Sequence, residues 1–210
     1  MKTYYENLNM NRTVKIGLGS GFIIIIILSL YLLPFSTKTD GYSTGIQTQR
    51  NSKDIWLKTD RESPFVITNT PFQGLNYYSP NEDFIIKTKF SKNNKADSVR
   101  LMTNQGEVQA YHIFGEASFT FKGKNCTLQL LYLAGGSLFI PFIDATASKT
   151  TYGAGRYLET SIPTGNSLTL DFNMAYNPYC AYIDSYSCPF PPKSNVLKIN
   201  IEAGEKTYHQ

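Results

Sequence analysis

Four polar side chains in the second half of the chain have types and spacing that could support chemistry: Asp144, Arg156, Asp171 and Asn173. Asp144 ends one predicted strand and Arg156 begins the next. Asp171 and Asn173 end a third strand on one face, because side chains two residues apart in a strand point the same way. The planar guanidinium of arginine binds carboxylates through two parallel hydrogen bonds. If the three strands are neighbours, Arg156 lies between the two carboxylates.

Three kinds of site fit this group. The first is a buried ionic lock that ties the C-terminal segment to a sheet. The second is a catalytic pair in which Asp144 and Asp171 act as acid and base, as in the cleavage of a glycoside. The third is a pocket in which Arg156 binds a small anionic or carbohydrate ligand. The other residues of such a pocket would be Asn173, Tyr152, Tyr157, Tyr176, Tyr182 and Asn177.

The rest of the sequence gives catalysis little support. Of the two histidines, His112 lies in a predicted strand and His209 is the penultimate residue. The chain has no Gly-x-Ser-x-Gly elbow and no His-x-x-x-His pair. The Asp-x-Asn spacing is too common to indicate a cation site. We expect a non-catalytic binding or structural module of the envelope, without metal or cofactor. A hydrolase that acts on an envelope glycan or ester through Asp144 and Asp171 is the alternative.

The cysteines also allow more than one interpretation. Cys180 and Cys188 are eight positions apart. In an exported protein we expect them to form a disulfide, which would add about 2–3 kcal/mol of stability by closing a short loop. Free buried thiols are the alternative, and a zinc site would need two further ligands that the nearby sequence lacks. Cys126, on a predicted strand, is expected to be a small core residue.

The end of the chain looks architectural. The run Pro189–Pro192 cannot supply the amides of a central strand, so it is expected to lie over the surface as an extended strap. Glu202, Glu205 and Lys206 are expected to form a solvated chain end.

Short strands must position all these residues. Turn residues such as Asn104–Gly106 separate them so closely that antiparallel hairpins are expected. We predict an all-β fold, an antiparallel sandwich or partly open barrel of about nine strands. A short helix over Gln47–Lys58, which Ser63 and Pro64 end, and one transmembrane helix precede it. The predicted strands are Phe84–Phe90, Val99–Thr103, Val108–Phe114, Ala117–Lys122, Thr127–Leu133, Leu138–Ile143, Arg156–Ile162, Ser167–Phe172 and Val196–Ile201.

The N-terminus carries the localisation signal. Ile16–Phe35 is a run of twenty residues without a charge, long enough to cross the hydrocarbon layer as a helix. Lys2, Arg12 and Lys15 precede it, so the positive-inside rule places the N-terminus in the cytoplasm and the domain in the periplasm or outside the cell. A cleaved signal peptide is the alternative. The predicted parts are a cytoplasmic segment (1–15), a signal anchor (16–35), a tether (36–45) and the β domain (46–210).

The composition excludes one class of partner. The formal net charge is +4, but Lys and Arg are not clustered, so nothing indicates nucleic-acid binding. The expected partners are therefore the membrane, through the N-terminal helix, and a small ligand. The oligomeric state does not follow from the sequence.

Several long motifs, in one order over residues 46–206, resemble the bacterial family of domain of unknown function 1684. The resemblance implies a shared β-rich fold and brings no activity with it. One difference is Ala147–Lys149, where the family pattern has Ser-Gly, so this turn is expected to differ. The matching stretches are Ser63–Phe65, Phe72–Leu75, Tyr77–Tyr78, Asp144–Thr146, Thr151–Tyr157, Asp171–Tyr182, Cys188–Pro192, Asn195–Leu197 and Ala203–Lys206.

Overall fold

A computed structural model describes residues 41–133 and 135–208 of the chain. The predicted signal anchor, residues 16–35, lies outside the described residues, as does the predicted cytoplasmic segment. Among the helices of the described part, none combines the length and the apolar content that a membrane crossing requires.

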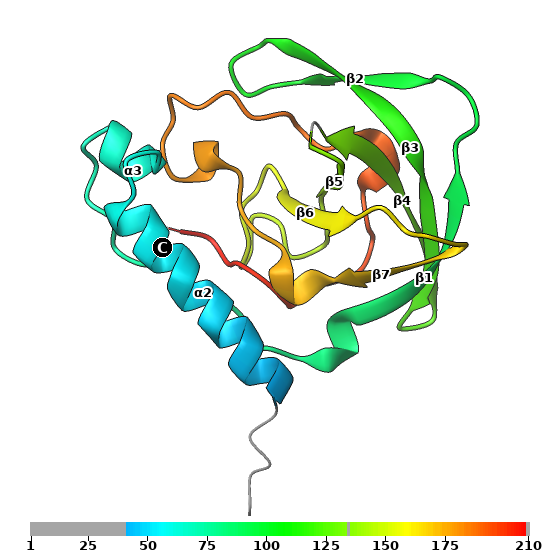
Figure 1. Cartoon of the computed structure of the whole chain (residues 1–210), viewed down its shortest axis with the longest axis horizontal. Helices are drawn as coiled ribbons and strands as arrows, with labels where there is room; N and C mark the ends of the chain where they lie inside the picture. Colours follow the sequence, from blue (N-terminus) through cyan, green and yellow to red (C-terminus); the bar gives the residue numbers. More distant parts are fainter. Residues whose placement is uncertain (1–40, 134, 209–210) are drawn as a thin grey trace, which may run out of the picture. The chain divides into compact units, whose positions relative to one another are not determined.

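Within the described residues, seven strands form one antiparallel sheet that curls into a half-barrel (Figure 1). The sheet order is β6-β5-β4-β3-β1-β7, and β2 pairs with the first part of β3. The mostly β prediction is confirmed, and the partly open barrel is the architecture that the chain adopts rather than the sandwich. The strands are β1 (Ile85–Lys92), β2 (Ser98–Met102), β3 (Val108–Phe121), β4 (Lys124–Leu133), β5 (Ser137–Phe142), β6 (Arg156–Ser161) and β7 (Ser167–Asp171).

The sheet has fewer strands than predicted for two reasons. The predicted break at Gly115 and Glu116 is a β-bulge, where the register with β4 shifts, so two predicted strands are the single strand β3. Gly115 is required because a Cβ there would collide with the carbonyl oxygen of Ser91 on β1. The second reason concerns the segment 196–206, which we call the C-terminal strap. It is extended, but among the described residues it forms no ladder with a strand. Isolated bridges join Val196 to Ile143 and Glu205 to Tyr77, and single backbone hydrogen bonds add to them.

The hollow of the half-barrel is filled by side chains. Alternate residues of the strands point inward, as in Phe84, Ile86 and Phe90 of the first strand region. The C-terminal strap contributes to the same core, and its alternation of buried and exposed residues explains why it was predicted as a strand. Its buried members are Leu197, Ile199, Ile201 and Ala203. The barrel interior is therefore a packed core, closed by the end of the chain.

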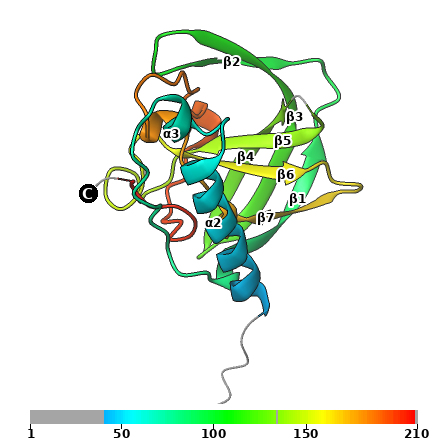
Figure 2. The ribbon, with the colours of Figure 1, turned by 60° about the vertical axis from the view of Figure 1, so that its left-hand side comes forward.

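Helix α2 (Gly41–Thr59) crosses in front of the open side of the curled sheet (Figure 2). It is longer than predicted, so residues 41–45 of the predicted tether are helical. Leu57 is buried as expected, but Ile55 is 63% exposed because two residues turn the side chain by about 200° around a helix. Short helices complete the fold: α3 (Pro64–Ile67), η1 (Glu82–Phe84), η2 (Phe172–Met174), η3 (Tyr179–Ala181) and η4 (Lys193–Asn195).

Ser63 and Pro64 were predicted to end the helix; α2 ends earlier, at Thr59, and these two residues begin the short helix α3. The Ser63 hydroxyl accepts a hydrogen bond from the Phe65 N–H, and Pro64 occupies the first turn of α3. The proline-rich run lies as expected along the domain surface. Its Phe190 N–H donates to the carbonyl of Met102, so it covers one end of the edge strand β2.

Candidate functional site

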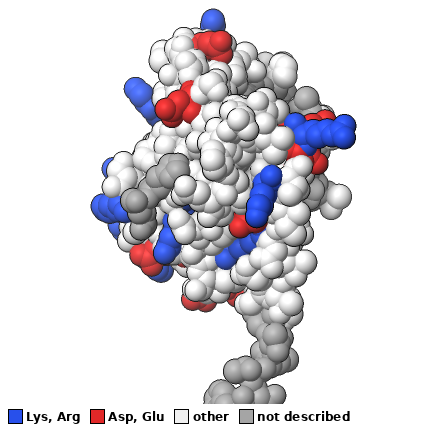
Figure 3. All heavy atoms as spheres, turned by 90° about the vertical axis from the view of Figure 1, so that its left-hand side faces the viewer, with Lys and Arg blue, Asp and Glu red and all other residues white. Residues whose placement is uncertain are grey.

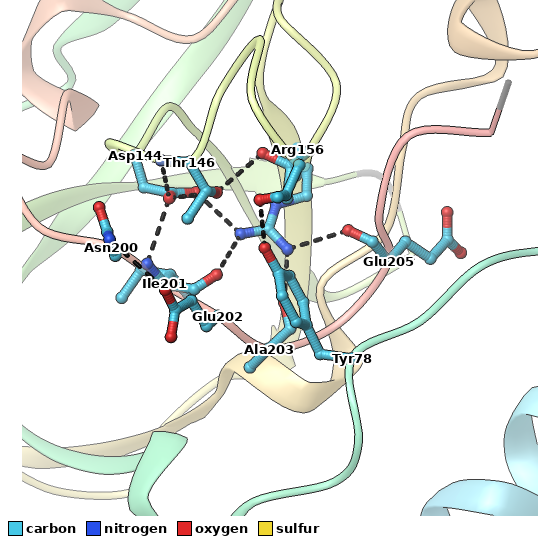
Figure 4. Close-up of polar contacts among 11 residues, drawn as sticks. Tyr78, Asp144, Thr146, Arg156, Asn200, Ile201, Glu202, Ala203 and Glu205 are labelled. Carbon is cyan, nitrogen blue, oxygen red and sulfur yellow. Dashed lines mark hydrogen bonds and ion pairs between the residues drawn. The ribbon is translucent and has the colours of Figure 1, made fainter. Parts of the chain in front are cut away.

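Arg156 is a clamp on the C-terminal strap (Figure 4). The residue is 1% exposed, and its Nη2 donates to Asp144 Oδ2 and to the carbonyl of Ile201, both at 2.8 Å. Nη1 donates to the carbonyls of Ala203 and Glu205. In an ordinary sheet, the N–H groups of a neighbouring strand would donate hydrogen bonds to these carbonyls. Here the guanidinium of Arg156 donates them, so the strap lies along the barrel without being a strand of its sheet.

Asp144 serves the same clamp. Its Oδ1 accepts hydrogen bonds from the Thr146 N–H at 2.8 Å, from the Thr146 hydroxyl at 2.6 Å and from the Ile201 N–H at 3.2 Å. Both carboxylate oxygens are thus used inside the fold. Together with Arg156, this residue forms the ionic lock that was one of the three interpretations of the sequence.

Asp171 does not contact the Arg156 clamp and lies instead at the start of η2. It caps η2 by accepting hydrogen bonds from the Asn173 N–H and side-chain amide, and it also accepts one from the Tyr42 hydroxyl at 2.8 Å. In the described part of the chain, the ion pair of Arg156 is with Asp144 alone. The predicted arrangement, with Arg156 between two carboxylates, is therefore not found.

Asn173 joins this second place to the start of the sheet. Its side-chain amide donates to the Asn81 carbonyl and accepts from the Asn81 N–H, both at 2.8 Å. Burial and the hydrogen bond to Asp171 raise the pKa of the Tyr42 hydroxyl well above its usual value. These contacts fix η2, the approach to β1 and the first turn of α2 relative to one another.

The sequence interpretation missed a third polar group, which is centred on Glu205. The expectation of a solvated chain end is wrong for this residue, which is 1% exposed. One oxygen accepts from Lys53 Nζ. The other accepts from the Asn177 N–H at 2.9 Å and from the Tyr182 hydroxyl. Residue 205 thus carries a buried carboxylate whose cation comes from helix α2.

Arg50, one helical turn before Lys53, adds contacts between α2 and the segment before the sheet. Its Nη1 donates to the carbonyl of Tyr78 at 2.8 Å, and its guanidinium carbon lies 4.4 Å from the centre of the Tyr77 ring. Lys53 Nζ lies 4.8 Å from the centre of the Tyr176 ring. The signal in the sequence was the spacing of these two cations, which places both on one face of the helix.

Some buried polar atoms between helix α2 and the rest of the domain lack a hydrogen bond. Four side-chain atoms here are buried and have no hydrogen-bond partner in the described part of the protein: Arg50 Nε, Asp54 Oδ1, Tyr77 Oη and Asn177 Oδ1. Burial raises the pKa of the Asp54 carboxyl. Groups left in this state are destabilising, because they have lost water without gaining a partner.

Four tyrosines form a surface beside this group; we call Tyr152, Tyr176, Tyr179 and Tyr186 the tyrosine surface. Tyr179 is 37% exposed and its ring meets that of Tyr186 edge to face at 5.4 Å, while the other three are half-buried. The Tyr176 hydroxyl donates to the exposed carboxylate of Glu159.

Tyr157, which the sequence suggested for a binding pocket, lies beneath this surface. It is buried, and its hydroxyl donates to the Pro189 carbonyl at 2.7 Å. Tyr182 is also buried, against Glu205. Of the predicted pocket tyrosines, only Tyr152 and Tyr176 therefore lie at the tyrosine surface.

Cys180 and Cys188 lie below the same tyrosines. The expected disulfide is absent, and both residues are free buried thiols, as is Cys126. The Cys188 sulfur instead accepts a hydrogen bond from the Cys180 N–H at 3.2 Å. Hydrogen bonds from the Cys180 thiol and from backbone N–H groups lower the pKa of Cys188 to about 7. The short loop is thus held by hydrogen bonds.

The face that carries α2 has no concentration of charge. Figure 3 shows Lys, Arg, Asp and Glu scattered over a largely uncharged surface. This distribution agrees with the absence of a basic cluster in the sequence.

The model of one protein family, described as "Protein of unknown function (DUF1684)", matches residues 70–206. The chain is also 33% identical to an uncharacterized protein of Haloarcula marismortui with a solution NMR structure. This likeness covers 82% of the present chain and 97% of the other, with a TM-score of 0.62. No curated protein matches. Neither description names an activity.

Proposed function

The chain belongs to the DUF1684 family of proteins of unknown function, and we propose that it is a non-catalytic module that binds a carbohydrate at its tyrosine surface. The observation that carries this proposal is the exposed side chain of Tyr179 in a group of tyrosines of which Tyr176 donates a hydrogen bond to the exposed carboxylate of Glu159. Tyrosine rings offer a flat apolar face together with a polar hydroxyl. A sugar ring also has apolar C–H faces and polar edges, so it is complementary to this surface.

The charges near the surface favour a neutral ligand over an anionic one. Glu159 and Asp184 are exposed carboxylates near the tyrosines, and they can accept hydrogen bonds from sugar hydroxyls. Arg156 was the residue expected to attract an anion, but its guanidinium is committed to Asp144 and to backbone carbonyls. We therefore narrow the expected ligand to a carbohydrate.

The hydrolase alternative has no comparable support. Asp144 accepts hydrogen bonds at both oxygens inside the Arg156 clamp, and Asp171 caps η2 and receives the Tyr42 hydroxyl. An acid and a base for glycoside cleavage must flank one bond. These two carboxylates serve two separate structural contacts instead.

The predicted anchor suggests where such a module would act. If residues 16–35 hold the chain in a membrane with its N-terminus inside, the domain faces the envelope, where glycans are abundant. Protease protection of the full chain in intact cells tests this part of the proposal. Degradation of the domain by external protease after outer-layer permeabilisation supports it, and protection from the protease under those conditions refutes it.

Binding itself is tested by titrating envelope glycan fragments into isotope-labelled protein and following the tyrosine-surface resonances by NMR. Tyr179→Ala should weaken binding about tenfold, because a lost stacking contact costs about 1 kcal/mol or slightly more. Tyr132→Ala is the matched control, since Tyr132 is 42% exposed on β4 outside the tyrosine surface. Equal loss in both variants, or no glycan-dependent shifts at all, would refute the proposal.

A further inference from the structure

The sulfurs of Cys180 and Cys188 lie in direct contact close to the surface of the domain. The Cys188 sulfur accepts a hydrogen bond from the Cys180 N–H at 3.2 Å and another from the Cys180 thiol. The two residues are 6% and 8% exposed, and residues 184 to 187 between them are exposed or half-buried. Two sulfurs in hydrogen-bonding contact are close enough to bind one metal ion together.

Cys126 differs from this pair and shows the surroundings of a cysteine that only packs. It lies in the core of the half-barrel, where its thiol donates to the carbonyl of Lys124 at 3.7 Å. Burial raises the pKa of this thiol, so it keeps its proton. The Cys188 sulfur instead accepts hydrogen bonds, which favours a thiolate. The thiolate is the form of cysteine that binds metals.

A second donor lies at the other sulfur of the pair. The Tyr152 hydroxyl is 4.0 Å from Cys180 Sγ, and burial raises the pKa of Tyr152 to about 12, so the hydroxyl keeps its proton at neutral pH. It can therefore donate to a Cys180 thiolate, while the Cys180 N–H donates to Cys188. Groups that hydrogen-bond to metal ligands orient them and tune their charge. Each sulfur of the pair thus has its own donor.

The remaining neighbours of the two sulfurs select the kind of ion. Within residues 41–133 and 135–208, no group of three or more His, Cys, Asp or Glu side chains could hold a metal. Zinc takes four such ligands in structural sites, and calcium and magnesium take oxygen ligands. The pair is surrounded instead by apolar and aromatic side chains such as Leu131, Phe139 and Tyr157. Copper(I) is a soft ion that prefers thiolates and can bind two of them in line, so it needs no further ligand.

We infer that Cys180 and Cys188 form a site for one copper(I) ion, bound between the two sulfurs. Two S–H bonds break, two Cu–S bonds form and both protons leave to solvent. The product is a complex with one negative charge, and no electron is transferred. The Cys180 N–H and the Tyr152 hydroxyl stabilise this charge, and the apolar neighbours keep water away from the ion.

Titration of the reduced full chain with copper(I), in detergent and without oxygen, tests this site. A coloured copper(I) chelator, bathocuproine disulfonate, competes for the ion, and its absorbance reports the copper that the protein leaves. We expect one copper(I) per chain, with two sulfur neighbours in the X-ray absorption spectrum. Cys180→Ser and Cys188→Ser should each lose the ion to the chelator, because one thiolate is missing. Cys126→Ser is the matched control and should bind as the wild type does.

Tyr152→Phe distinguishes a built site from two thiols that are merely close together. This variant keeps both cysteines and the ring but removes the hydroxyl donor, so its affinity for copper(I) should fall about tenfold. Tyr186→Phe is the control, since Tyr186 packs in the same cluster and its hydroxyl is hydrogen-bonded to neither sulfur in the described part of the chain. This comparison also decides the matter if a serine variant fails to fold.

Four results would overturn the inference. The first is complete loss of copper(I) from the wild type to the chelator, and the second is equal loss in Cys126→Ser and Cys188→Ser. The third is equal affinity in Tyr152→Phe and Tyr186→Phe, because copper(I) would then bind as it does to any two thiols. The fourth is a Cys180–Cys188 disulfide that resists reduction in the folded chain, since its sulfurs are not available to an ion.

Discussion

Two buried ion pairs, Arg156–Asp144 and Lys53–Glu205, hold the same short stretch of the C-terminal strap. They differ in how many of the buried polar atoms around them have a hydrogen-bond partner. At the Arg156 clamp, four hydrogen bonds join the guanidinium to Asp144 and to three carbonyls, both oxygens of Asp144 accept hydrogen bonds, and of the clamp's buried side-chain polar atoms only Arg156 Nε has no partner among the described residues. In the polar group centred on Glu205, the carboxylate is paired with Lys53, but four buried polar atoms around the contact, on Arg50, Asp54, Tyr77 and Asn177, have no partner among the described residues.

The difference shows that the burial of a charged side chain does not by itself indicate which structural role the side chain has. The Arg156 clamp joins two parts of one core and leaves its carboxylate without a free oxygen. The group centred on Glu205 joins the core to helix α2 through the ion pair with Lys53. A buried network with more of its hydrogen bonds made holds its parts more rigidly, whereas each buried polar atom without a partner lowers the cost of separating the parts. We therefore expect substitutions at the two places to differ in size and in kind.

Arg156→Ala should have the largest effect. It leaves Asp144 buried without its cation and three carbonyls without a donor, so we expect a loss of about 3–5 kcal/mol in the free energy of unfolding. Urea denaturation followed by circular dichroism measures this loss. Arg100→Ala is the control, because Arg100 is exposed on β2 and its substitution should cost less than about 0.5 kcal/mol. Similar losses in the two variants would remove the special role of the clamp.

Glu205→Gln should have an intermediate effect. The amide keeps the shape of the side chain but leaves Lys53 without a counter-charge, and we expect a loss of about 1–3 kcal/mol. Glu202→Gln is the matched control three residues earlier, since Glu202 is exposed on the same strap. If the loss for Glu205→Gln equals or exceeds that for Arg156→Ala in the same denaturation experiment, the contrast between the Arg156 clamp and the group centred on Glu205 is wrong.

Asp54→Asn should have the smallest effect and the opposite sign. Burial raises the pKa of the Asp54 carboxyl in the folded protein, so folding favours its protonated form. Its contribution to stability is complete below the ordinary carboxylate pKa and is lost as the pH rises through the raised value. The neutral amide avoids that loss. The variant should gain no more than about 0.5 kcal/mol at neutral pH, and the gain should vanish in acid. Melting curves across this pH range test the sign, and a loss at neutral pH would contradict it.

Much of the half-barrel could be predicted from the sequence because strands follow local rules. Alternating apolar residues and turn residues located most of the strands and the hairpins between them. The bulge at Gly115 was not predicted. A glycine in a turn and a glycine that allows another strand to approach closely cannot be told apart in the sequence. The strap was wrongly predicted as a strand. Its apolar and polar residues do alternate as in a strand, and only the long-range contact with Arg156 shows that it is not part of the sheet.

The polar sites could be predicted only in part. The ionic lock between Asp144 and Arg156 followed from their positions at strand ends. The burial of Glu205 did not, because it depends on a helix more than a hundred residues earlier in the chain. Short sequence windows carry no information about such a pairing. The cysteine pair shows the same limit, since spacing allows a disulfide but tertiary geometry decides whether the sulfurs bond.

The position of the strap has a consequence for how the protein is made. Its side chains complete the core, and its partners Arg156, Lys53 and Tyr77 are synthesised long before it. Because domains fold as units and the chain emerges from its N-terminus, the half-barrel cannot close until the strap, residues 196–206, has been synthesised. Long-range closure of this kind also slows folding. A nascent chain that stalls before residue 196 would therefore expose an open apolar hollow, which makes it a substrate for chaperones and proteases.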